Sequence, residues 1–295
     1  MDVMGKPVLA FTIIFIASVL CAAAIPFAFG EDVSTSVSIG NAPPVVGGLN
    51  TSMAIDLSSC GTVKVWCNAT ITDSNGWNDV NMVNATFWDP AATSQEAADN
   101  NNTHYTSTQY TGACTLNGGS GSNVNANCSF TVLYHANPAA WECRIYANDT
   151  SSNVGNNSRT GITVNTLRAL DANNTIGFGS LSPGATSVSD SDNIVLNCGN
   201  TALDLNLSGT DLTNATASVT NVSVSYVKYN VTDAAQSYAD AMIALSTTPA
   251  YANFTLAKRT TVLSVDDTYW KIGIPASIEN LVFTGTISFT AVPDT

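Results

Sequence analysis

Short segments in which apolar and polar residues alternate are the feature that most constrains this fold. From Val63 to Ile71, Val, Cys, Ala and Ile occupy every second position, with Lys, Trp, Asn and Thr between them. The same period of two recurs over 80–88, 128–135, 141–147 and 203–208. Successive side chains of a strand point to opposite faces of a sheet, so this pattern is typical of half-buried strands. Helical periodicity is confined to 233–242. The sequence therefore predicts an all-β protein with two consecutive β-sandwich, immunoglobulin-like domains.

Breaks in the pattern divide the chain into four parts. The segment 33–39 alternates as a strand does, but Pro43 and Pro44 then interrupt it, because paired prolines cannot continue a strand ladder. We expect a signal peptide over 1–30, an N-terminal strand and linker over 31–44, a first sandwich over 45–165 and a second over 166–295.

The N-terminus has the pattern of an export signal. Lys6 precedes an apolar run from Val8 to Ala24, and the small residues Ala28 and Gly30 follow at the expected cleavage positions. This arrangement predicts a secreted, extracellular or cell-surface protein. The alternatives are a retained membrane anchor and a prepilin-type signal, so we expect membrane contact only through an uncleaved N-terminal segment.

Six cysteines follow the predicted signal, which is typical of disulfides in an exported chain. Cys67 and Cys143 each lie on the apolar face of a strand, which predicts a Cys67–Cys143 bond between the two sheets of the first sandwich. Cys114 and Cys128 flank a Gly-rich hairpin tip and are expected to bridge its arms. Cys60 and Cys198 remain open: they pair across the domains, or Cys60 pairs locally with Cys67.

Composition excludes some partners and favours others. Charged residues are 11% of the chain and the net charge is −13, a balance that repels phosphate backbones and excludes nucleic acid. Asn-x-Ser/Thr acceptor sites indicate a glycoprotein, with the Asn- and Ser/Thr-rich composition as the alternative source of the matches. The thirteen sites are Asn50, Asn68, Asn84, Asn101, Asn127, Asn148, Asn156, Asn173, Asn206, Asn214, Asn221, Asn230 and Asn253.

A calcium site is the one cofactor that the sequence points to. Asp73 and Asp149 each follow a cysteine by six residues, which places them at the same end of the first sandwich. Asn75 and Asp79 in the adjacent loop add oxygen ligands, and calcium binds six to eight oxygens. The alternative is an Asx turn beside a solvated loop.

Catalytic chemistry has little support. Two histidines are present, His104 and His135, and both are expected to be solvated polar residues rather than general bases. The few Glu residues are scattered, without the paired carboxylates of a glycosidase. We therefore expect no enzyme.

Several motifs resemble secreted surface proteins common in archaea. Residues 41–46, the turn Thr72-Asp73-Ser74-Asn75-Gly76 and the strand from Trp141 to Asp149 are similar to Ig/PKD-type domains. Residues 178–292 resemble TasA/camelysin matrix-fibre and WxL-type surface domains, although Glu279-Asn280-Leu281 replaces the glycine expected in the last hairpin and no WxL dipeptide pair is present. The resemblance implies surface sandwiches and no particular activity.

Two roles follow as expectations. The first is a structural cell-surface protein, a subunit of a filament, surface layer or matrix, that self-associates by donating the strand 33–39 to a neighbour; the alternative is that this strand closes its own domain. The second is an adhesin or glycan-binding module, with Trp66, Trp77 and Trp88 as exposed platforms.

Overall fold

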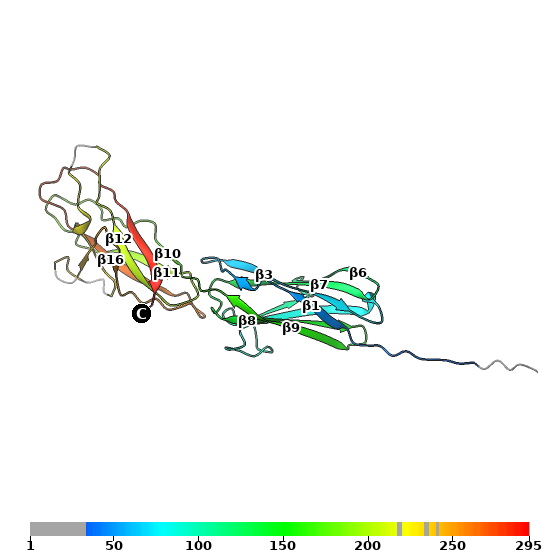
Figure 1. Ribbon diagram of the computed structural model, residues 1–295. Coiled ribbons are helices and arrows are strands. Elements are labelled where there is room, and N and C mark those ends of the chain that lie inside the picture. Colours follow the sequence, from blue (N-terminus) through cyan, green and yellow to red (C-terminus); the bar gives the residue numbers. More distant parts are fainter. Residues whose placement is uncertain (1–33, 217–219, 233–235, 240–241, 295) are drawn as a thin grey trace, which may run out of the picture. The chain divides into compact units, whose positions relative to one another are not determined.

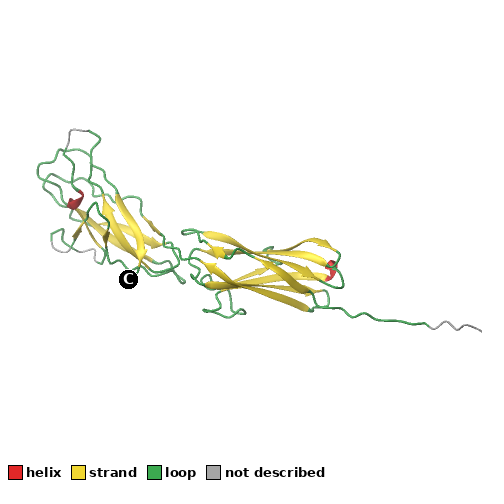
Figure 2. Ribbon diagram, in the orientation of Figure 1, coloured by secondary structure: helices red, strands yellow, loops and turns green. Residues whose placement is uncertain are grey.

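The computed structural model of the 295-residue chain describes residues 34–216, 220–232, 236–239 and 242–294 (Figure 1). The predicted signal peptide over 1–30 lies outside these residues. The described part is all-β, as predicted: besides strands it contains two 3₁₀ turns, η1 (Trp77–Asp79) and η2 (Val224–Tyr226) (Figure 2). It has no helix of the length and apolarity needed to cross a membrane. Within the predicted helix over 233–242, residues 236–239 form a loop and turn, and most of the rest lies outside the described residues.

Two antiparallel-dominated sheets form the first sandwich. The first sheet has the strand order β1-β3-β7-β6, and the second has the order β2-β9-β8-β4-β5. Their strands are β1 (Val45–Asn50), β2 (Ala54–Ile55), β3 (Thr62–Thr72), β4 (Val80–Trp88), β5 (His104–Thr108), β6 (Cys114–Ser120), β7 (Asn123–Leu133), β8 (Ala140–Asp149) and β9 (Val154–Val164).

Alternation along these strands builds the core of the first sandwich. In β3, the apolar positions from Val65 to Ile71 are buried, while Lys64 and Trp66 face outward. Trp141 of β8 is fully buried and stacks on Phe87 of β4, with ring centroids 4.7 Å apart. The hydrophobic effect thus acts on one face of each sheet, as the period of two requires.

A second sandwich follows along the chain. A five-stranded sheet has the order β10-β11-β16-β13-β14, and a three-stranded sheet has the order β15-β12-β17, with β17 at its edge. Their strands are β10 (Leu170–Ala172), β11 (Ser191–Asn197), β12 (Leu203–Gly209), β13 (Val227–Asn230), β14 (Ile243–Ala244), β15 (Ala250–Tyr251), β16 (Val265–Ile272) and β17 (Ile287–Pro293). Its core includes Leu203, Leu205, Leu207 and Trp270, all fully buried.

The N-terminal segment differs from the expectation. Residues 34–44 form neither strand nor helix, and Val37 and Ile39 are exposed. A strand exists only where its backbone groups pair with those of a neighbouring strand. The strand predicted over 33–39 is not formed over its described residues, 34–39.

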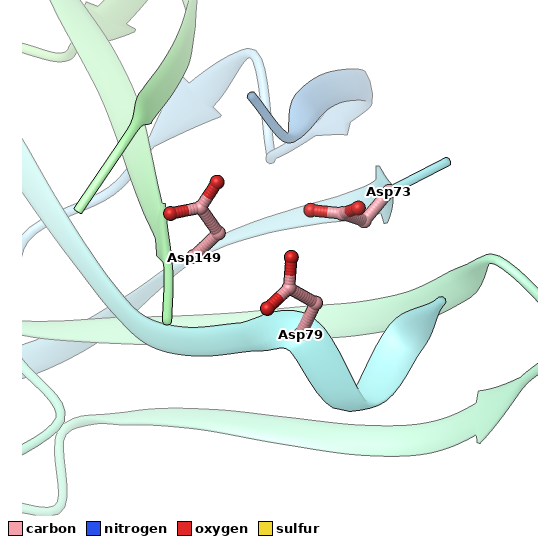
Figure 3. Close-up of side chains that lie close together, drawn as sticks. All are labelled: Asp73, Asp79 and Asp149. Carbon is pink, nitrogen blue, oxygen red and sulfur yellow. The ribbon is translucent and has the colours of Figure 1, made fainter. Parts of the chain in front are cut away.

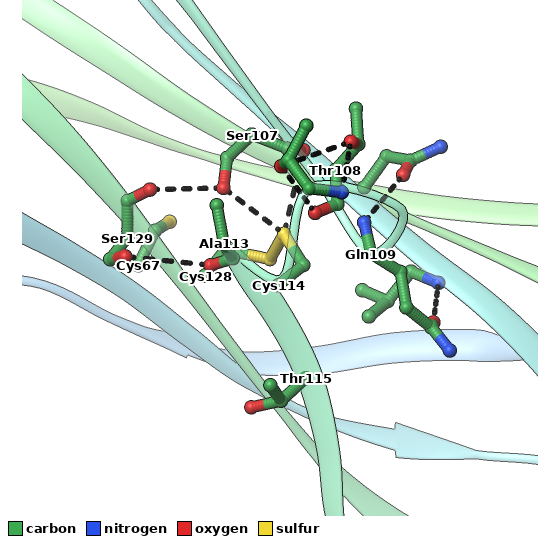
Figure 4. The surroundings of a disulfide bond; sticks show 12 residues. Cys67, Ser107, Thr108, Gln109, Ala113, Cys114, Thr115, Cys128 and Ser129 are labelled. Atoms are coloured by element: carbon green, nitrogen blue, oxygen red, sulfur yellow. Dashed lines mark hydrogen bonds between the residues drawn. A yellow bond between two sulfur atoms is a disulfide. The ribbon is translucent and has the colours of Figure 1, made fainter.

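Three disulfides join cysteines of the described residues. Cys67–Cys143 joins the two sheets of the first sandwich, and Cys114–Cys128 joins β6 to β7, which are the two pairs expected. Beside the second bond, the Ser107 hydroxyl donates to the carbonyl oxygen of Ser129 at 2.9 Å (Figure 4). The pairing that spacing left open is Cys60–Cys198, which links the first sandwich to the second over 138 residues.

Candidate functional site

Three aspartates meet at one end of the first sandwich (Figure 3). Asp73 follows the last residue of β3, Asp79 ends the 3₁₀ turn η1, and Asp149 is the last residue of β8. One carboxylate oxygen from each lies within 4.8 Å of the others. The equal spacing of Asp73 and Asp149 from their disulfide-bonded cysteines explains this meeting, because the two strands leave the bond in the same direction.

Asp149 is held in place by hydrogen bonds. Its Oδ1 accepts from the backbone N–H groups of Ser151 and Asn153 at 2.9 and 2.8 Å, and its Oδ2 accepts from the side-chain amides of Asn153 and Asn41 at 2.8 and 3.0 Å. Desolvation raises the pKa of Asp149, but the hydrogen bonds from Asn153 and Ser151 outweigh it and hold the pKa below its ordinary value. The carboxylate is therefore kept charged.

In Asp73 and Asp79, only one of the two carboxylate oxygens accepts a hydrogen bond. Asp73 Oδ1 accepts from the Asn75 backbone N–H at 2.8 Å, and Asp79 Oδ1 accepts from the Thr150 hydroxyl. The second oxygen of each is buried and has no hydrogen-bond partner. Among the described residues, no ion pair involves a carboxylate of this cluster.

Asn75, the fourth predicted ligand, has another contact. Its side chain is exposed, and its Oδ1 accepts from the backbone N–H of Ala42 at 2.8 Å. The structure thus assembles the three aspartates and uses the Asn75 side chain to hold the start of the chain that enters β1.

A cavity of about 750 Å³ opens in the second sandwich, and polar and apolar atoms contribute about equally to its surface. The loop after β10 and the segment before β17 provide much of its lining, and Glu279 is the one charged residue among the described residues that line it. Residues that line it include Ile176, Phe178, Leu212, Ile278, Leu281 and Phe283. No periodic sequence pattern predicts this cavity, because much of its lining comes from irregular segments.

The strand beside the cavity has an incompletely covered inner face. Along β17, Ile287, Phe289 and Ala291 pack against the core but stay partly exposed. The inward residues of the paired strand β12, such as Leu205 and Leu207, are fully buried. The inner face of this sheet is therefore fully buried at its central strand β12 and partly exposed at its edge strand β17.

The tryptophans differ in exposure. Trp88 is buried at 4%, which corrects its expected role as an exposed platform. Trp77 is partly exposed and its ring covers the backbone of Gly119. Trp66 is 48% exposed on the outer face of β3, with the Lys64 ammonium 5.7 Å from its ring centroid.

Both histidines are buried, which corrects the expectation that they are solvated. His104 has hydrogen-bonding contacts with Asp99 and the Gln95 carbonyl, at 3.0 and 2.8 Å. Burial, with smaller effects from Arg259 and Lys258, lowers the pKa of His135 to about 4. Tertiary packing of the 89–104 loop, which the sequence pattern does not reveal, buries the first of them.

None of the thirteen acceptor asparagines is buried. Several lie on the outward-facing positions of strands, such as Asn68 in β3 and Asn127 in β7, which are register partners. The outer faces of the sheets thus present these side chains to solvent.

No protein-family model and no curated protein matches this chain. Among solved structures, one similar chain has the description "Structural basis for the promiscuous specificity of the carbohydrate-binding modules from the beta-sandwich super family"; it is 9% identical, the match covers 86% of this chain and 100% of that one, and the TM-score is 0.25. Another, described as BspA_C_WT, is 10% identical over 85% of this chain and 96% of that one, with a TM-score of 0.23. TM-scores of this size establish nothing about the function of this chain.

Proposed function

We propose that this chain is a structural protein of the cell surface whose copies join by strand exchange. In this assembly, residues 33–39 of one copy lie beside β17 of the next and cover the cavity of its second sandwich. The observation that carries the proposal is the partly exposed inner face of β17, at the edge of its sheet and beside the cavity. The resemblance of residues 178–292 to matrix-fibre proteins agrees with this role.

The donor segment has the chemistry that such a cavity needs. Thr35, Val37 and Ile39 alternate with serines, so a strand would direct the larger side chains to one face. Val37 and Ile39 are 86% and 85% exposed in the single chain. Residues 34–39 have no charged side chain, so desolvating them requires no buried charge.

The acceptor matches the donor in length and in bonding capacity. The strand β17 has seven residues, as does the segment 33–39. An edge strand presents backbone N–H and C=O groups to an added strand. Burying Val37 and Ile39 contributes about 1.5–3 kcal/mol each. A contact of this head-to-tail kind repeats from copy to copy and builds a filament.

The test separates donor from acceptor in the chain that begins at Glu31. The donor variant is Val37→Asp with Ile39→Asp, and its control is Ser36→Asp with Ser38→Asp, on the opposite face of the same segment. The acceptor variant is Leu281→Asp in the cavity lining, and its control is Val262→Asp, which is 75% exposed away from the cavity. We expect electron microscopy to show filaments for the wild type and both controls, and monomers for the donor and acceptor variants.

Mixing the two defective variants makes the test directional. The Leu281→Asp chain retains an intact donor, and the Val37→Asp, Ile39→Asp chain retains an intact acceptor. Light scattering of the mixture should show heterodimers that do not grow further. Monomers in the wild type, or filaments that persist in the donor variant, would contradict the proposal. The cavity would then be a candidate site for a small ligand.

The exposure of Trp66 favours a second candidate function, a glycan-binding surface module. Aromatic rings offer flat apolar faces to sugar rings, and Trp66 stands on the outer face of β3. This role ranks second because a single exposed ring is a smaller feature than the cavity and the partly exposed inner face of β17 in the second sandwich.

A further inference from the structure

We propose that Asp73, Asp79 and Asp149 bind a calcium ion at the end of the first sandwich. The inference is independent of strand exchange, because the site lies in the first sandwich and uses no residue of the cavity. It names a metal site from three carboxylates that come from both sheets: Asp73 extends β3 of one sheet, while Asp79 and Asp149 adjoin β4 and β8 of the other.

The first argument is charge. Oxygens of three carboxylates lie within 4.8 Å of one another, and no Lys, Arg or His forms an ion pair with them among the described residues. Like charges at such distances repel one another even in water, and the repulsion is stronger where water is excluded. A divalent cation between them turns this repulsion into attraction.

The second argument is burial without a partner. Asp73 has no exposed surface, yet its Oδ2 accepts no hydrogen bond, and the buried Oδ2 of Asp79 accepts none either. A buried charged oxygen without a partner is strongly unfavourable, and native structures generally satisfy such groups. Figure 3 shows the Asp73 carboxylate directed towards the other two side chains.

The third argument is the kind of ligand. The cluster offers carboxylate oxygens alone, without the His or Cys ligands that zinc and other softer metals use. Hard cations take oxygen ligands, and calcium tolerates irregular geometry, with carboxylates in one- or two-oxygen modes and water in the remaining positions. Asp149, fixed by its four hydrogen bonds, anchors the set.

Binding has a structural consequence that can be measured. An ion held by residues of both sheets stabilises the folded first sandwich, since the unfolded chain does not bring the three carboxylates together. Extracellular calcium modules have dissociation constants of about 10⁻⁴–10⁻³ M. At 10 mM calcium, we therefore expect the Tm of this sandwich to rise by on the order of 5 °C over its value in EDTA.

The experiment compares calcium and EDTA in the wild type, in Asp73→Asn and Asp79→Asn, and in the control Asp267→Asn, a partly exposed carboxylate of the second sandwich. Calcium should raise the Tm of the wild type and of the control, and it should leave the Tm of both cluster variants, Asp73→Asn and Asp79→Asn, unchanged. In EDTA, Asp79→Asn should be at least as stable as the wild type, because it removes one repelling charge and keeps an oxygen for Thr150. A residue with only a structural role would instead lower the Tm in both buffers.

Terbium gives a second readout that does not depend on stability. Trp77 and Asp79 are the two ends of the three-residue turn η1, so the Trp77 ring is near the site and can sensitise terbium luminescence. We expect luminescence from the wild type that calcium displaces, and at least a tenfold loss of terbium affinity in Asp73→Asn. A wild type whose Tm and terbium signal do not respond to calcium would overturn the proposal.

Discussion

The carbonyl oxygen of Pro44 lies 1.7 Å from the point that a Cβ atom on residue 155 would occupy. Gly155, in β9, therefore lets the backbone before β1 lie directly against the opposite sheet. We expect Gly155→Ala to destabilise the first sandwich by about 1–3 kcal/mol or more, because the backbone must move apart. Urea unfolding checks this value. Gly47→Ala in β1 is the matched control, since its Cβ would meet nothing closer than 3.8 Å and its loss should stay small.

Removal of the Cys60–Cys198 disulfide should uncouple the two sandwiches. The two cysteines are 138 positions apart, and the chain-entropy model gives a loss of about 5 kcal/mol for such a loop, against about 3 kcal/mol for the separation of 14 between Cys114 and Cys128. Calorimetry of the Cys60→Ser, Cys198→Ser chain should show two separated transitions. A single transition at the wild-type temperature would contradict this expectation.

Acid should destabilise the protein partly through His135. Its pKa is about 4 in the folded chain, against about 6.5 when unfolded, so below pH 6.5 the unfolded state binds the proton that the folded state refuses. The stability from neutral His135 is thus complete above pH 6.5 and is lost as the pH falls towards 4. Allowing for solvent screening, we expect this effect to lower the free energy of unfolding by about 1 kcal/mol at pH 5.

The measurement is urea unfolding at pH 7.5 and pH 5 for the wild type and His135→Gln. The variant has no titrating group at this position, so its loss between the two pH values should be smaller than that of the wild type. Equal losses in the two chains would show that His135 titrates normally in the fold.

Substitution of Trp66 separates the two candidate functions. Trp66→Ala should leave the free energy of unfolding within about 0.5 kcal/mol, because the ring is half exposed. If the chain binds glycans through this ring, Trp66→Ala should abolish binding on a glycan array, while the control Tyr110→Ala, at a residue 89% exposed, retains it. Filament formation should be unchanged in both variants.

Sequence patterns predicted the features that depend on strand periodicity. The faces of β3 and β8, and with them the meeting of Asp73 and Asp149, follow from alternation and from equal spacing after Cys67 and Cys143. The position of the Asn75 side chain was missed, because it depends on the path of residues 41–42. The buried histidines and the cavity were missed for a related reason: tertiary packing of irregular segments decides them, and such segments have no period to read.

Covalent connectivity also determines how this chain would carry a pulling force. Tension applied at Asn41 and at the C-terminal end passes from Cys60 to Cys198 through the disulfide, so the backbone between these cysteines bears no load while the bond is intact. Of the first sandwich, only the roughly 20 residues from Asn41 to Cys60 can be drawn out, a reach of about 70 Å at about 3.4 Å per residue. The strands β3 to β9 are thereby shielded from extension, and β1 and β2 are the strands of the first sandwich that tension can extend.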